Sequence, residues 1–122
     1  MERQTEFGST IIEDAVLATI AAEAALATDG VVALGTRRWV NGSVVLIRHP
    51  DPSRGVKVTA LDDGGYQLDL YVVLLYGVKI GRVGRILAER VHQALTEAVG
   101  VAPLHIVIHV EGVRRRDDAP SD

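Results

Sequence analysis

The histidines are the first residues in this chain that could perform catalysis or bind a metal. His105 and His109 lie four residues apart, a spacing that on a helix brings two rings to the same face. Their segment, LHIVIHVEGV, alternates as a β-strand does, and on a strand this spacing separates them by about 13 Å, at about 3.3 Å per residue. One ion cannot bridge that distance. The sequence therefore predicts neither a metal site nor a cofactor.

A basic cluster, Lys79, Arg82 and Arg85, surrounds a G-x-x-G motif formed by Gly81 and Gly84. In KH domains such a motif clamps a nucleic-acid backbone, but there it joins two helices, whereas here a strand runs directly into one helix. These cations near a helix start could instead hold an anion or an acidic partner. A solvated polar face is the favoured interpretation, and a nucleic-acid-binding module is kept as the alternative function.

Asp69 is a carboxylate within an apolar strand, and its expected role is structural, beside Lys57 or Thr59 across a hairpin. Asp62 and Asp63 belong to a turn and Glu13 and Asp14 to a helix start, and the carboxylates form no convincing acid–base pair. The chain contains no nucleophile elbow, phosphate-binding loop or dinucleotide fingerprint. The sequence therefore predicts a protein that is not an enzyme.

Trp39 is the only tryptophan, and Arg37 and Arg38 precede it. Trp and Arg contribute most to the energetics of protein interfaces. A partner-binding loop and an ordinary hairpin packed on the domain are both open at this point.

Composition restricts the class of protein further. The chain has 122 residues, 48% of them hydrophobic and 24% charged, with a net charge of −3 and no cysteine. Length predicts one domain at residues 8–113, with residues 1–7 and a charged tail at 114–122 disordered. The N-terminus does not resemble a signal peptide, and the longest apolar tract contains Glu23 and is too short to span a bilayer. We expect a cytoplasmic protein.

The spacing of the apolar residues predicts the helices and strands that position these residues. Apolar spacing predicts helices at about 13–28 and 80–99, the second ended by Gly100. Strands are expected at 8–12, 30–35, 44–47, 56–61, 66–76 and 104–113. A three-residue hairpin loop at 63–65 places Val58 opposite Leu70.

The predicted fold is a small two-layer α/β domain of the α+β type, with a mostly antiparallel sheet covered on one face by two helices. The opposite sheet face mixes apolar and polar residues, as a surface buried on assembly does. We expect on that face Lys57, Thr59, Asp69, Tyr71, Val73, Leu75, His105, Val107 and His109. Together with the Arg37–Trp39 loop, this face is the predicted site for self-association or partner binding.

Four blocks of the chain resemble the alkaline shock protein family of bacterial envelope stress response proteins. They are AVLATIAAEAALATDGVVAL at 15–34, GVKVTALDDGGYQLDLYVVLLYGVKI at 55–80, ILAERVHQALTEAVG at 86–100 and HIVIHVEGVR at 105–114. The resemblance implies a cytoplasmic, non-enzymatic protein that associates with itself, is held at the membrane by a separate anchor protein in some members, and contributes to cell-envelope homeostasis. It supplies no catalytic residues.

Overall fold

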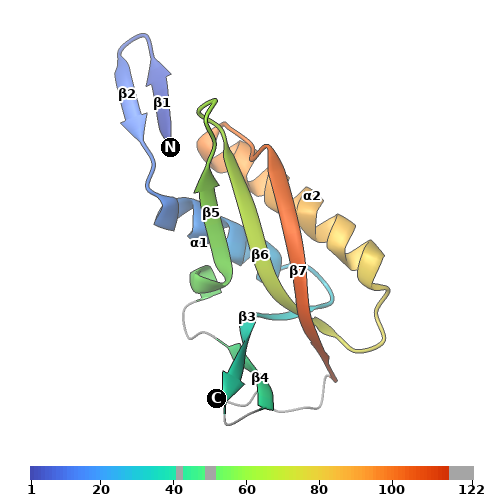
Figure 1. Cartoon of the computed structure of the whole chain (residues 1–122). Coiled ribbons are helices and arrows are strands. Elements are labelled where there is room, and N and C mark those ends of the chain that lie inside the picture. Colours follow the sequence, from blue (N-terminus) through green and yellow to red (C-terminus); the bar gives the residue numbers. More distant parts are fainter. Residues whose placement is uncertain (41–42, 49–51, 116–122) are drawn as a thin grey trace.

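The fold was analysed in a computed structural model, which describes residues 1–40, 43–48 and 52–115, with only the backbone for 36–40 and 43–48. The described residues form two α-helices, a short 3-10 helix and seven strands, in the order shown in Figure 1. Their bounds are β1 Glu2–Thr5, β2 Gly8–Ile11, α1 Asp14–Leu26, β3 Val31–Val40, β4 Ser43–Arg48, η1 Pro52–Gly55, β5 Val56–Ala60, β6 Tyr66–Leu75, α2 Ile80–Val99 and β7 His105–Arg114.

Strand β6 is the centre of the main sheet. Strand β7 runs parallel to it along one edge, because the crossover helix α2 returns the chain to the end at which β6 began. Strands β5 and β3 pair antiparallel with successive halves of the other edge, and β4 pairs antiparallel with β3. The predicted α+β fold with a mostly antiparallel sheet is confirmed, and the strand order, which the sequence left open, is β4-β3-β6-β5 with β7 beside β6.

Both helices pack on one face of this sheet, so the core lies between two layers (Figure 1). The even-numbered residues of β6 point toward the helices and are buried. Helix α2 contributes a regular apolar stripe, whereas α1 contributes mostly alanines, which let it approach the sheet closely. The buried residues are Leu17, Ala18, Ala21, Ala22 and Ala25 of α1, Tyr66, Leu68, Leu70, Val72 and Leu74 of β6, and Val83, Leu87, Val91 and Leu95 of α2.

The β5–β6 hairpin has the predicted loop length but a different register. Leu61 and Gly65 close the loop with a backbone hydrogen bond of 2.9 Å, so the three loop residues are 62–64. Gly64 takes the left-handed conformation that this loop requires (φ 90°). Val58 therefore faces Leu68 and not Leu70. The shift is two residues, so the same side chains remain on the helix-facing side.

The expected strand at 8–12 is present as β2, and it forms a hairpin with β1, which lies within residues 1–7, where the sequence alone indicated disorder. The ammonium group of Met1 donates to the carbonyl of Ile12 (2.7 Å), and the Arg3 guanidinium donates to the carbonyl of Val99 at the end of α2 (2.9 Å). Thr5 holds the turn by accepting from the amide of Phe7. Every residue of both strands is exposed, and the hairpin projects from the body (Figure 1). The tail beyond residue 115 lies outside the described residues.

Glycines stop the second helix and the central strand, as expected. Gly77, after β6, has φ 95°, and Gly100 caps α2 with φ 81°. Both values lie in the left-handed region that favours glycine.

Candidate interaction face

The sheet face opposite the helices brings together the residues that the sequence placed there. Lys57, Asp69 and Val107 form one row across β5, β6 and β7, and Tyr71 is paired with His109. A second row contains Thr59, Gln67 and His105. We name this surface the open face. Neither helix covers it.

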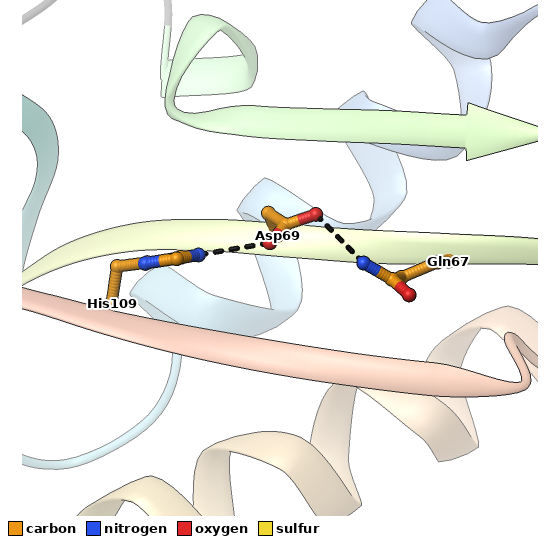
Figure 2. Close-up of polar contacts among 3 residues, drawn as sticks. All are labelled: Gln67, Asp69 and His109. Carbon is orange, nitrogen blue, oxygen red and sulfur yellow. Dashed lines mark hydrogen bonds and ion pairs between the residues drawn. The ribbon is translucent and has the colours of Figure 1, made fainter.

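Four side chains at the middle of the open face form a connected cluster, and Figure 2 shows three of them, Gln67, Asp69 and His109. Nε2 of His109 lies 2.8 Å from Oδ1 of Asp69, and Nε2 of Gln67 donates to Oδ2 of the same carboxylate at 3.3 Å. The His109 ring also stacks on Tyr71, with 4.4 Å between ring centroids and 12° between the ring planes. The cluster fixes an aromatic pair and a carboxylate in one arrangement on a face that is otherwise open.

The environment of Asp69 keeps its carboxylate ionised at neutral pH. The hydrogen bond from His109 lowers the pKa of Asp69, and Gln67 and the nearby Lys57 act in the same direction, against the opposing effect of burial. An ionised carboxylate can only accept hydrogen bonds, so Nε2 of His109 is the donor. Asp69 does face Lys57, as predicted, but its hydrogen bonds go to the other two residues.

Two predicted face residues have little surface to offer a partner. Val73 lies on the open face between Ala33 and Gly112 but is only 4% exposed. Leu75 is half-buried at the end of β6, near the first turns of α2. On the accessible part of the open face, Tyr71 and His109 are half-buried, and Lys57, Thr59, His105 and Val107 are exposed.

The Arg37–Trp39 segment is part of strand β3, not a free loop. Its backbone pairs with residues 44–46 of β4, which confirms the predicted hairpin arm. The side chains of Arg37, Arg38 and Trp39 lie outside the described residues, so their predicted role in partner binding stays a prediction.

The histidines do not converge on a metal-like site. Within the described ranges, no group of three or more His, Asp or Glu side chains is placed to hold an ion. His109 instead faces Asp69, and His105 is exposed at the start of β7.

The basic cluster borders a groove that the sequence did not indicate. Lys79 and Arg82 line a hollow of about 710 Å³ between the start of α2, the end of β6 and the turn before β3, whereas Arg85 is not part of its lining. Half-buried apolar side chains form its floor. The remaining lining residues are Asp29, Gly30, Leu75, Val78, Val83 and Ile86. We name this hollow the basic groove.

The G-x-x-G motif lies in the first turns of α2 and not in a loop. Neither Gly81 nor Gly84 has a positive φ, and a Cβ atom added at either would meet nothing within 4 Å. This differs from the KH arrangement, in which the glycines form the link between two helices.

Sequence reasoning missed Gln67, the pairing of His109 with Asp69 and the basic groove. The pairing of His109 with Asp69 depends on the parallel placement of β7, and the basic groove depends on the turn at residues 29–30. Gln67 lies two residues before Asp69 on β6, so the alternation along that strand was its signal. A strand–helix–strand unit with one crossover helix predicts that its strands are parallel. That rule was the available signal for placing Tyr71 next to His109.

Comparison with known proteins gives a consistent result over most of the chain. Residues 2–115 match the sequence model of the alkaline shock protein 23 family, which is described by a cell envelope-related function. The uncharacterized protein YloU of Bacillus subtilis is 29% identical over 115 residues, covering 93% of this chain and 95% of YloU. YqhY of the same organism is 31% identical over 110 residues, covering 90% of this chain and 80% of YqhY. Spy1614 of Streptococcus pyogenes is 29% identical over 111 residues, covering 90% and 91% of the two chains.

No solved structure gives a significant match. Of the helices in the described part of the chain, none has the length and hydropathy to cross a membrane.

Proposed function

The chain belongs to the alkaline shock protein 23 family, whose function is related to the cell envelope, and from this membership we propose that it is a non-enzymatic scaffold of the envelope stress response. In this proposal it acts in the cytoplasm by binding a second copy of itself or a membrane-anchored protein. It needs no cofactor, and its contact with the membrane is made through that partner.

The open face is the observation that supports this proposal. It carries an ordered pair of rings, Tyr71 and His109, fixed by the carboxylate of Asp69. Aromatic residues are enriched in protein interfaces because they supply large contact areas while losing little conformational freedom. A helix layer buries the other side of the sheet, so a flat partner surface has direct access to these rings.

The chemistry of the cluster favours binding over catalysis. A carboxylate–histidine pair can act in acid–base catalysis when a nucleophile or substrate pocket lies beside it. Two of the grooves among the described residues, the basic groove and one between α2 and β7, are lined by other side chains and not by Asp69 or His109. A stacked pair of rings on an uncovered sheet face is typical of a protein contact surface.

The test is capture of partners from cells by the wild-type protein and by a Tyr71→Glu variant, combined with sedimentation at increasing concentration. The half-buried Tyr71 ring takes no part in the core, so the variant should fold and lose most of the captured partner or of the self-association. Tyr76→Glu is the matched control, since this tyrosine is 60% exposed and lies beyond the end of β6. The proposal fails if the wild type stays monomeric and Tyr71→Glu captures the same proteins in the same amounts.

A further inference from the structure

The N-terminal hairpin presents an aromatic side chain that is almost fully exposed. Phe7, the only phenylalanine, is 93% exposed at the turn between β1 and β2. Ile11 on the same hairpin is 69% exposed. A single two-stranded hairpin is marginally stable in water, and this one is tied to the body through Arg3 and through Met1 and Ile12, which pack against the core. A hairpin of this kind gains stability when its apolar tip is covered.

The basic groove has the size and chemistry to receive that tip. Its volume of about 710 Å³ lies within the usual range for ligand pockets, about 300–1,000 Å³. Its floor is apolar, with Leu75, Val78 and Ile86 half-buried and open to an incoming ring. Its rim carries two cations, Lys79 and Arg82, and one carboxylate, Asp29.

Charge complementarity pairs the groove with the hairpin. Glu6 precedes Phe7 at the turn, so an inserted tip brings a carboxylate next to the basic rim. Among the described residues, Lys79 and Arg82 make no ion pair that would compete. The first turn of α2 has no acidic residue and no side-chain cap, so its amide groups and dipole also favour a carboxylate there.

The second groove in the described residues fits less well. It has about 480 Å³ and lies between the second half of α2 and the start of β7. Its rim carries Glu89, with His92 and His105. An incoming Glu6 would meet the like charge of Glu89 there, whereas in the basic groove two cations, Lys79 and Arg82, outnumber the one carboxylate, Asp29.

The hairpin cannot reach the basic groove of its own chain. Arg3 fixes the hairpin at the carbonyl of Val99, whereas Lys79 stands at the opposite end of α2. The 20 residues of that helix span about 30 Å, and each four-residue strand of the hairpin spans only about 13 Å. Figure 1 shows the hairpin at one end of the molecule and the start of α2 at the other.

We propose that Phe7 and Glu6 of one copy dock into the basic groove of a second copy. The contact joins two different surfaces, so it is head-to-tail, and repetition builds open chains or closed rings. This inference rests on the proposed self-association but uses residues away from the open face. The two proposals can therefore fail separately.

The experiment measures the mass of the full chain against concentration by sedimentation or light scattering. Phe7→Ser removes the apolar tip without touching the core, and it should raise the concentration needed for association at least tenfold. Glu6→Arg and Arg82→Glu should each raise it severalfold. The chain carrying both charge reversals restores opposite charges across the contact, so it should associate again. An equimolar mixture of the two single variants should associate again in alternating order, since the reversed tip of one matches the reversed groove of the other and the unchanged tip matches the unchanged groove.

Glu89→Arg is the matched control in the second groove and should leave association unchanged. Thermal unfolding by circular dichroism shows whether each variant keeps the wild-type fold. The inference is overturned if wild type is monomeric throughout, if Phe7→Ser associates like wild type, or if the double reversal fails to restore what the single reversals lose. Loss of association in Tyr71→Glu alone, with Phe7→Ser unaffected, would assign self-association to the open face instead.

Discussion

At the residue scale, the open face depends on one carboxylate with several partners. Asp69 accepts hydrogen bonds from His109 and Gln67, and His109 in turn stacks on Tyr71. A change at Asp69 therefore affects both the stability of the sheet and the orientation of the exposed ring.

Replacing Asp69 with Asn should lower stability at neutral pH by about 1 kcal/mol or less, the range for accessible ion pairs. The pKa of Asp69 is lower in the folded protein than in the unfolded chain. Its stabilisation is therefore present above the unfolded value of about 3.9 and is lost as the pH falls through the folded value. Urea unfolding of both proteins at pH 7 and at pH 3 measures this. The difference should shrink in acid, and a constant difference would contradict the role given to the carboxylate.

The buried hydroxyl of Tyr66 leads to a prediction about stability at alkaline pH. Its hydroxyl donates to the carbonyl of Val101 (2.7 Å), and burial raises its pKa to about 12. The folded state keeps this proton at a pH where the unfolded chain, with a pKa of about 10, has lost it. The stability contributed by Tyr66 should therefore fall as the pH rises above about 10.

A Tyr66→Phe variant separates this effect from the other groups that titrate in alkali. It should be about 1 kcal/mol less stable at pH 7, because one buried hydrogen bond is lost. Between pH 10 and 12 the wild type should lose stability faster, by up to about 1.4 kcal/mol per pH unit. Free energies of unfolding at pH 7, 10 and 11 test this, and parallel losses in both proteins would refute it.

At the element scale, helix α2 has glycines in two different situations, within the helix and at the cap that follows it. Gly100 ends the helix with φ 81°, and an added Cβ would collide with the guanidinium of Arg3. Gly84 is within the helix, and an added Cβ would meet nothing within 4 Å. Alanine should therefore have opposite effects at these two positions.

Gly100→Ala should destabilise the domain by about 1–3 kcal/mol, the cost of a left-handed residue with a side chain. Displacing Arg3 should also loosen the β1–β2 hairpin. Gly84→Ala should stabilise by about 0.5–1 kcal/mol, because alanine is the better helix former. Midpoints of urea unfolding provide the measurement, and a shift in the same direction for both variants would contradict this reading of the helix.

At the scale of the whole molecule, the sequence predicts which layer and face a residue belongs to better than it predicts which residues it contacts. The alternation along β6 correctly separates Leu68, Leu70 and Val72 from the open face. The register of β5 differs by two residues because Asp62, not Asp63, begins the loop. Both residues are aspartates before Gly64, so composition does not distinguish the two choices.

The candidate site shows the same limit more clearly. Asp69, Tyr71 and His109 can be assigned to one face from the period of two alone. Their contact requires the parallel pairing of β7 with β6 in one register, which long-range packing and the α2 crossover determine. The β1–β2 hairpin was missed for another reason: strand β1 is polar and exposed, and its hydrogen bond to the body is a single contact from Arg3 to the distant carbonyl of Val99.

The pairing of β6 with β7 also has a consequence for biosynthesis. A ribosome produces β6 together with the strands of its other edge, but the strand that completes its second edge emerges only after the whole of α2. Until then the nascent chain exposes a long row of unpaired peptide groups beside an incomplete core, a state in which chains are prone to aggregate. Translation speed through the codons for residues 80–114 should therefore influence how much of this protein reaches its native state.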